Sequence, residues 1–249
     1  MKSDAGGSGD LLARLAALEG VSSSMAASRD GIDALLRDRG LRSTGPELTA
    51  ESLLRGAHAS AVLEGADATL EEVRQTGGGA MVRAALRLST ELLGLVPTWR
   101  AAPLQALARM HTLAGKSVVA DDDLGRPRDA DSARRLRDLA ALVAGDTSAP
   151  ALVVAAVVHA EVASAAPFAS HNGIVARAAE RLTLVARGVD PASLVVPEAG
   201  HLHLHREYES NLRGYRDGGP AGVHAWLLYA AEAYAAGAEA SPLTRRPAG

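Results

Sequence analysis

Residues 159–177 read HAEVASAAPFASHNGIVAR, the most informative stretch of the chain. An apolar run breaks at Ala166-Pro167-Phe168 and restarts after Asn172-Gly173. Asn and Gly permit a tight turn, and a helix that begins there directs its first free N–H groups back at the loop. Such a helix N-terminus is suited to bind an anion, most often phosphate. The same pattern is also typical of an ordinary corner between two helices.

Helix-forming residues surround this stretch. Ala, Leu and Arg abound, whereas the 249 residues include only one Phe and two Trp. Residues 151–165 are apolar nearly all round, which indicates a helix buried among other helices. Apolar spacing and capping residues predict further helices after Asp10 and Ser28, over 49–64, after the capping box Thr69–Glu72, over 81–93, from Pro103, over 132–143, over 174–187, and around Tyr208 and Trp226. We therefore expect an all-α fold, a single helical bundle.

The segment from Lys116 to Arg128 differs from this pattern. Val118-Val119, followed by Asp121-Asp122-Asp123, predicts a short strand and a turn, and so a small β-hairpin flap over 116–128. The three aspartates belong to no spaced set of metal ligands. We interpret them as the exposed turn of the hairpin, and we expect this flap to lie beside the Phe168 loop.

Composition excludes several classes of protein. The formal net charge is −3 with no long basic run, which argues against nucleic-acid or anionic-membrane partners. No cysteine is present, so disulfides and thiolate metal sites are excluded. The longest apolar run, 149–158, is too short to cross a bilayer. We expect an N-terminal extension over 1–45, its first ten residues disordered, then one domain over 46–240 and a tail over 241–249, in the cytoplasm.

The 159–177 stretch resembles the signature loop of the Fic (Fido) family, named for filamentation induced by cAMP. That motif reads His-x-Phe-x-Asp/Glu-Gly-Asn-Gly-Arg-x-x-Arg, usually with Pro before the Phe. The positions that match are Pro167, Phe168, Asn172, Gly173 and Arg177, together with His159, which corresponds to a His often found seven residues before the catalytic one. Four positions differ: Ala166 replaces the catalytic His, Ser170 the acidic metal ligand, His171 a Gly, and Ile174 the first Arg.

A second resemblance lies upstream. Ser60-Ala61-Val62-Leu63-Glu64-Gly65 is similar to the family's inhibitory-helix pattern, Ser/Thr-x-x-x-Glu-Gly/Asn. Met110-His111 and the segment from Tyr208 to Trp226 resemble other core helices of the family. The likeness covers roughly residues 49–234.

The resemblance implies an adenylyltransferase (AMPylator) ancestry. Such proteins typically transfer AMP from ATP to a target hydroxyl: a His acts as base, a carboxylate holds Mg²⁺, and amides and arginines grip phosphate. The implied nucleotide-binding residues here are Phe168, Ser170, Asn172, Gly173 and Arg177, and the implied inhibitory residues are Ser60, Glu64 and Gly65. Glu64 would pair with Arg177, about 3 Å apart, and block a phosphate position; the alternative is an ordinary buried ion pair.

The departures weigh against catalysis. Ala166 cannot take a proton, and loss of a general base costs about 10²- to 10⁴-fold in rate. Ser170 is a poor ligand for Mg²⁺, so metal binding is expected to be weak or absent, and Ile174 removes a phosphate-binding cation. No catalytic residue and no metal ligand is assigned.

Three functions stay open. The first is a pseudoenzyme that keeps a binding site for ATP, another nucleotide or phosphate and has a regulatory or protein-binding role. A protein partner would bind the segment 116–128, and the chain could also form a homodimer. The second is a nucleotidyl or phosphate-group transferase that uses His171, or a base outside the motif. The third is an interaction module that binds no nucleotide. His159 is expected to be a hydrogen-bonded core residue, and His201, His203 and His205 a solvated cluster rather than a metal site.

Overall fold

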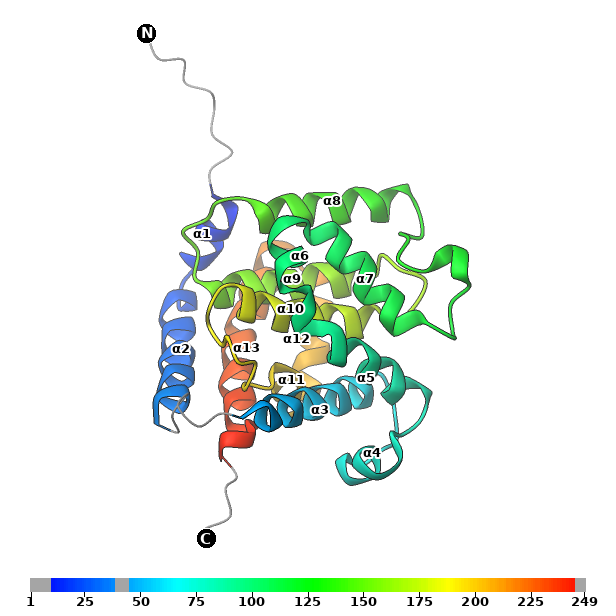
Figure 1. Ribbon diagram of the computed structural model, residues 1–249. Helices are drawn as coiled ribbons and strands as arrows, with labels where there is room; N and C mark the ends of the chain where they lie inside the picture. Colours follow the sequence, from blue (N-terminus) through cyan, green and yellow to red (C-terminus); the bar gives the residue numbers. More distant parts are fainter. Residues whose placement is uncertain (1–9, 39–44, 245–249) are drawn as a thin grey trace.

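The computed structural model describes residues 10–38 and 45–244, and these ranges contain helices, turns and loops but no β-strand (Figure 1). The all-α prediction is therefore confirmed. Apart from Asp10, the expected disordered leader lies outside the described residues. The helices, with three short 3₁₀ segments, are α1 Leu11–Ala16, α2 Val21–Asp38, α3 Pro46–Leu63, α4 Leu70–Thr76, α5 Ala80–Leu92, η2 Leu93–Leu95, α6 Val96–Ala101, α7 Pro103–Gly115, η3 Asp121–Asp123, α8 Ala130–Ala144, α9 Ala151–Ala165, α10 Asn172–Ala186, α11 Pro197–His203, α12 His205–Asp217, α13 Gly219–Glu239 and η4 Pro242–Thr244.

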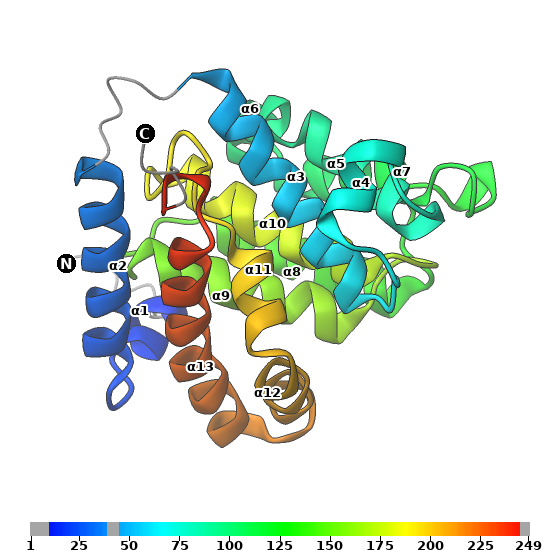
Figure 2. The ribbon, with the colours of Figure 1, turned by 90° about the horizontal axis from the view of Figure 1, so that it is seen from below.

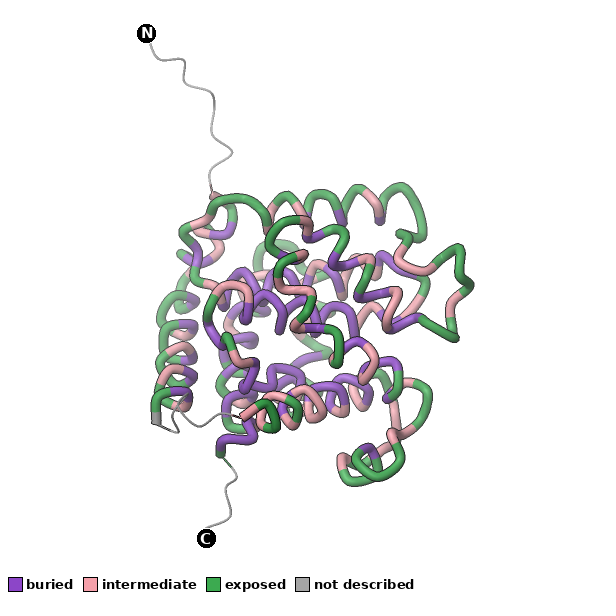
Figure 3. Tube along the Cα trace, viewed as in Figure 1, coloured by how far each residue is buried: buried purple, intermediate pink, exposed green. Residues whose placement is uncertain are grey.

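Helices α9 and α10 form the centre of the molecule (Figure 3). They pack against each other, and α10 also contacts α3, α5, α6, α7 and α11. Every residue of α10 from Ile174 to Val185 is buried, including three charged ones. The loop 166–171 therefore joins the two most enclosed helices, and its backbone position is fixed by the core on both sides.

Local capping explains several helix ends. Asp10 accepts a hydrogen bond from the Ala13 amide and begins α1, as predicted. Thr69 and Glu72 form the predicted reciprocal capping box at the start of α4. Gly77 ends α4 with φ of 72°, a left-handed conformation that glycine adopts without steric cost.

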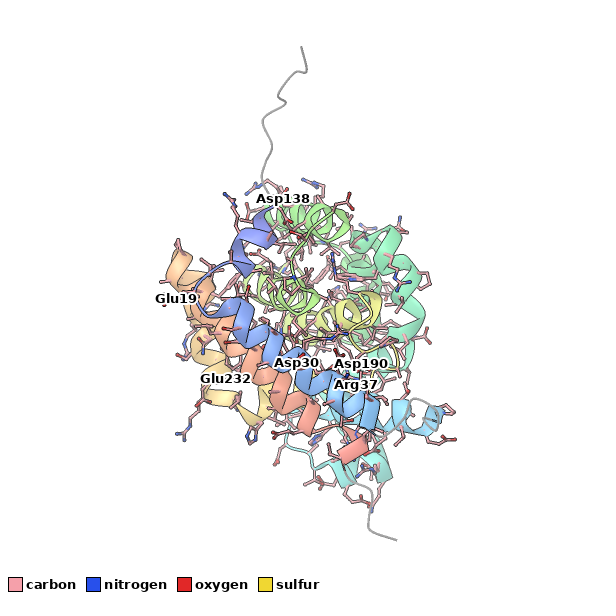
Figure 4. All side chains as sticks on the ribbon, turned by 90° about the vertical axis from the view of Figure 1, so that its left-hand side faces the viewer. Glu19, Asp30, Arg37, Asp138, Asp190 and Glu232 are labelled. Carbon is pink, nitrogen blue, oxygen red and sulfur yellow. The ribbon has the colours of Figure 1, made fainter. Side chains whose placement is uncertain are left out.

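The start of α2 was predicted wrongly. Ser28 lies inside the helix, which begins seven residues earlier at Val21, and its hydroxyl donates to the carbonyls of Ser24 and Ala231. The apolar residues Val21, Met25 and Ile32 are buried along one face, and this burial extends the helix through the serines before Ser28. That face packs against α13, which runs beside α2 (Figure 2). Figure 4 labels Asp30 of α2 and Glu232 of α13, both of which are exposed. The described part of the 1–45 extension thus belongs to the same hydrophobic core as the rest.

The predicted β-hairpin over 116–128 is wrong. The segment is a loop with one 3₁₀ turn, η3, because the Gly115 carbonyl accepts from the amides of both Val118 and Val119 and so closes a turn where a strand would begin. Most of the segment is exposed, and Val118 is 61% exposed. Its end does lie beside the Phe168 loop, as expected, since the Arg128 amide donates to the Pro167 carbonyl at 2.8 Å.

Among the described residues, no helix combines the length and apolar character needed to cross a bilayer.

Candidate functional site

The loop between α9 and α10 is closed by a single side chain. Asn172 accepts from the Phe168 amide through Oδ1 and donates to the Phe168 carbonyl through Nδ2, both at 2.9 Å. Phe168 is buried and stacks on His111, with ring centroids 4.4 Å apart. Ala166 and His171, at the two ends of the loop, have φ of 41° and 54°. The matching residues Phe168 and Asn172 therefore act together to shape the loop.

Arg177 extends from the second turn of α10 into the core, where it is 1% exposed. Its Nε donates to Ser60 Oγ at 2.8 Å, and its Nη2 donates to the Ser60 carbonyl at 3.0 Å. Its Nη1 donates to the hydroxyl of Tyr208, on α12, at 3.0 Å. These bonds fix the guanidinium between α3 and α12.

Glu64 completes the set of Arg177 partners. Its Oε1 lies 2.7 Å from Arg177 Nη2, which confirms the predicted contact between two residues 113 positions apart. The same oxygen lies over the first turn of α10, because a Cβ placed on Gly173 would be only 2.0 Å from it. Only glycine leaves room for this approach. The carboxylate thus occupies the positive end of a helix dipole and pairs with a buried cation, which is the environment of a bound anion.

The end of α3 gives Glu64 this position. Glu64 is the C-cap residue of α3, and Gly65 follows with φ of 87°, so the chain leaves the helix directly after the carboxylate. The side chain of Glu64 is 26% exposed. Water, or a competing anion, can therefore reach this carboxylate, although Arg177 itself is enclosed.

His171 and Ser170 contact each other inside the loop. His171 is 9% exposed, and its Nδ1 lies 2.5 Å from Ser170 Oγ. Burial lowers the pKa of the His171 imidazole below its ordinary value; nearby Glu64 opposes this shift and Arg87 adds to it. The ring is therefore neutral at pH 7, and it does not project to solvent. Ser170 supplies a hydroxyl that His171 already engages, and no carboxylate, so this position does not fit the Mg²⁺ ligand of the motif.

His159 is a hydrogen-bonded core residue, as expected. It is fully buried; its Nδ1 bonds to Glu180 Oε2 at 2.9 Å and its Nε2 to the Tyr208 hydroxyl at 3.1 Å. Burial lowers the pKa of His159 to about 4, with Glu180 opposing the shift, so the ring is neutral.

The expectation for His201 was wrong. His203 and His205 are exposed, but His201 is fully buried and bonds to Glu180 Oε2 at 2.9 Å and to the Tyr229 hydroxyl at 2.8 Å. Glu180 also accepts from the Tyr234 hydroxyl at 2.9 Å. A buried carboxylate requires such partners, and they draw His201 into the core. Burial would raise the pKa of Glu180, but its electrostatic interactions and hydrogen bonds with His159 and His201 outweigh burial and hold the pKa below its ordinary value.

The His159–Glu180–His201 cluster is explained by hydrogen bonding. One ligand atom from each residue lies within 4.8 Å of the others, as a metal site would require. However, both rings bond Glu180 directly at 2.9 Å, whereas two ligands of a tetrahedral zinc ion at ~2.1 Å would stand roughly 3.4 Å apart.

Sequence reasoning missed Glu180, the role of Tyr208 and a second arginine near the loop. Arg87 donates to the last carbonyls of α7 and lies close enough to affect His171. Glu180 carried a usable signal: it is a carboxylate between Arg177 and Arg181 in a helix whose remaining residues are mostly apolar, and a buried charge of that kind requires partners.

The sequence matches no protein-family model and none of the curated proteins. The structure, however, is similar to solved structures. A Fic family protein from Desulfovibrio desulfuricans G20 matches with a TM-score of 0.70 and 19% identity, over 87% of this chain and 73% of that one. Fic-1 from C. elegans matches with a TM-score of 0.67 and 13% identity, over 88% and 71%. This chain has the Fic fold. Within this Fic fold, the segment 60–65 meets the N-terminus of α10, where the signature loop ends.

Proposed function

We propose that this chain is a degenerate Fic-fold protein that binds a phosphate-bearing ligand at the N-terminus of α10 and does not transfer it. Glu64 occupies that position in the free protein and regulates access to it. The observation that carries the proposal is the ion pair between Glu64 and Arg177, which lies over Gly173.

The Glu64 carboxylate resembles a phosphate group in its surroundings. It combines a charge-assisted bond from a buried arginine with the positive end of a fifteen-residue helix. Both features attract any anion of that size, and Glu64 is exposed enough to be displaced. A nucleotide such as ATP, or a simpler phosphate ester, fits this chemistry.

The groups that chemistry would need are absent from the expected positions. Ala166 carries no base, and the Ser170 hydroxyl is no substitute for a carboxylate ligand. Ile174, which replaces the first arginine, is 2% exposed and part of the apolar core. Binding without transfer, with a regulatory role, is the function these residues support.

A second candidate function rests on His171. Its neutral ring lies 2.5 Å from Ser170 Oγ in the loop, so it could accept a proton from a hydroxyl. Transfer of AMP from labelled ATP to the protein itself, or to a cell lysate, tests this candidate. We expect no labelling; labelling that His171→Ala abolishes would establish the transferase instead.

Thermal shift with ATP, with and without Mg²⁺, and with inorganic phosphate tests ligand binding. A ligand at a hundred times its Kd stabilises by about 2.7 kcal/mol. We expect Glu64→Gly to increase the shift and Arg177→Ala to abolish it, with little effect of Mg²⁺. Glu239→Gly, at the exposed end of α13, is the matched control. If no variant responds to any ligand, the chain is an interaction module without a nucleotide site.

The exposed segment 116–128 is the surface we propose for a protein partner. It is bonded to the loop through Arg128, so a partner held there would lie next to the anion site. If a partner is found, replacing Asp121, Asp122 and Asp123 by Ser should weaken its binding; unchanged binding would place the partner elsewhere.

A further inference from the structure

The guanidinium of Arg177 is held by more groups than the ion pair requires. Ser60 Oγ, the Ser60 carbonyl and the Tyr208 hydroxyl accept three of its N–H bonds, and Glu64 accepts a fourth. Ser60 is 4% exposed and Tyr208 6%, whereas the side chain of Glu64 is 26% exposed. Three enclosed partners thus remain in place if Glu64 moves away.

Among residues 10–38 and 45–244, Tyr208 is the one partner that bonds to the Nη1 end of the guanidinium. Nη1 lies 3.2 Å from the position of a Cβ on Gly173, so it borders the space in which Glu64 Oε1 sits. An arginine Nη carries two N–H groups. Tyr208 accepts one of them at Nη1, which leaves the second as a donor for a ligand oxygen beside Nη2. This is the paired-donor geometry by which arginine recognises phosphate and carboxylate.

The hydrogens of this network follow from Glu180, whose ionised carboxylate only accepts. Neutral His159 therefore carries its proton on Nδ1 and donates to Glu180 Oε2, so its Nε2 accepts from the Tyr208 O–H. Arginine only donates, so the Tyr208 oxygen accepts from Arg177 Nη1. Bonds from His201 and Tyr234 fix the carboxylate in turn. Each group therefore orients the next, from Glu180 out to Arg177.

We infer that Tyr208, oriented by His159 and Glu180, is a positioning residue that keeps Arg177 directed at the anion site when Glu64 leaves it. This inference rests on the proposed binding of a phosphate-bearing ligand at that site. Loss of the Tyr208 hydroxyl would free one end of the guanidinium without altering any group that touches the ligand directly.

The first test measures the Kd of ATP and of inorganic phosphate by calorimetry in a Glu64→Gly background. Adding Tyr208→Phe should weaken binding of both ligands about tenfold or more, since a hydrogen bond to a charged group is lost. Tyr215→Phe is the matched control, because Tyr215 lies on the same helix and donates to Glu161 rather than to Arg177. It should leave the Kd unchanged. Equal affinities in the Tyr208 and Tyr215 variants would overturn the inference.

A second pair of variants separates orientation from packing. His159→Gln keeps an acceptor for Tyr208 and a donor for Glu180, whereas His159→Leu keeps neither. The glutamine variant should retain the Kd within about threefold, and the leucine variant should weaken it as Tyr208→Phe does. If glutamine and leucine have the same effect, His159 does not orient Tyr208.

A third readout does not depend on ligand. The Nη hydrogens of a clamped arginine rotate slowly and give separate NMR signals, so Arg177 should show them in wild type and in Glu64→Gly. In Tyr208→Phe these signals should broaden or merge. If no phosphate ligand binds any variant, the proposed function fails, yet the NMR comparison still decides whether Tyr208 holds Arg177. Unchanged Arg177 signals in Tyr208→Phe would refute that role.

Discussion

Two residues of the signature loop adopt a left-handed backbone without being glycine. Ala166 has φ of 41° and His171 φ of 54°, and an L-residue there costs roughly 1–2 kcal/mol relative to ordinary backbone. The burial of α9 and α10 on either side compensates for this cost. The loop thus adopts, at His171, a backbone conformation that glycine would favour.

This conformation leads to a prediction for position 171. His171→Ala and His171→Gly both remove the ring and its bond to Ser170. The difference between their free energies of unfolding therefore isolates the contribution of the backbone conformation. We expect the glycine variant to be more stable than the alanine variant by about 1 kcal/mol, because left-handed strain is relieved. Urea unfolding measures the difference. An alanine variant that equals or exceeds the glycine variant would show that the loop relaxes when the ring is removed.

At this scale the sequence predicted the Glu64–Arg177 contact but not what surrounds it. Both residues belong to recognisable motifs, whereas Tyr208, Glu180 and His201 are joined only by side-chain bonds between different helices. A side-chain network of that kind leaves no periodic pattern in the chain. His201 in particular, with histidines two and four residues later, has the local pattern of an exposed cluster.

Helix α3 docks on α10 through a stripe of small and polar residues spaced four apart. This stripe consists of Ser52, Gly56 and Ser60 and ends at the C-cap residue Glu64. Arg177 and Arg181 are also four residues apart on α10. Arg181 bonds to Ser52 and forms a buried ion pair with Glu198 at 2.8 Å. The glycine between the serines provides room for this pair. Two arginine contacts therefore join α3 to α10, and its Glu64 end lies at the N-terminus of α10.

The room at Gly56 can be tested. A Cβ there would lie 2.7 Å from Arg181 Nη2 and 2.9 Å from Glu198 Oε2, both buried and fixed by their mutual bonds. Gly56→Ala should therefore destabilise the protein by about 1–3 kcal/mol, as overpacking does. Gly31→Ala is the control: it lies inside α2 with nothing within 4 Å of the Cβ position, and should stabilise by about 0.5–1 kcal/mol. Thermal unfolding of both variants gives the comparison, and equal shifts would contradict tight docking of α3.

Helix ends were predictable where a cap determined them and not where packing did. Asp10 and Thr69 mark real boundaries, because the side chain of each accepts from a free backbone amide of its helix. Ser28 looked like a cap, yet burial of Val21 and Met25 carries α2 past it. In 116–128, Val118-Val119 suggested a strand. A strand requires backbone hydrogen bonds to a second strand, but the amides of Val118 and Val119 both donate to the Gly115 carbonyl.

Across the whole molecule, five consecutive helices meet at Glu180. Residues of α9, α11, α12 and α13 reach this carboxylate of α10 directly or through one hydrogen-bonded intermediary. The bonds from Glu180 through His159 to Tyr208 keep their direction only while His159 is neutral and Glu180 is ionised. The integrity of this network therefore depends on pH, and this dependence concerns the core as a whole rather than one surface.

The sign of that dependence follows from His159. Its pKa is about 4 in the folded protein, because of burial, against about 6.5 when unfolded. At a pH between these two pKa values, the unfolded chain binds a proton that the native state does not bind, so the free energy of unfolding falls as pH falls. The loss is complete below pH 4 and amounts to about 3 kcal/mol. Burial also lowers the pKa of His111 to about 4, so it adds a loss of the same sign.

Urea unfolding at pH 7, 5.5 and 4 in wild type and two histidine variants measures this effect. His159→Gln keeps the bonds to Tyr208 and Glu180 but cannot titrate. Its free energy of unfolding should therefore fall less steeply with falling pH than that of wild type, and the difference in slope should correspond to close to one bound proton. His203→Gln, which removes an exposed histidine of α11, should keep the wild-type slope. Parallel curves for wild type and His159→Gln would mean that the native core accepts a proton at His159. In that case the Tyr208 hydroxyl could not donate to His159, and the directed chain of bonds from Glu180 to Arg177 would not exist in acid.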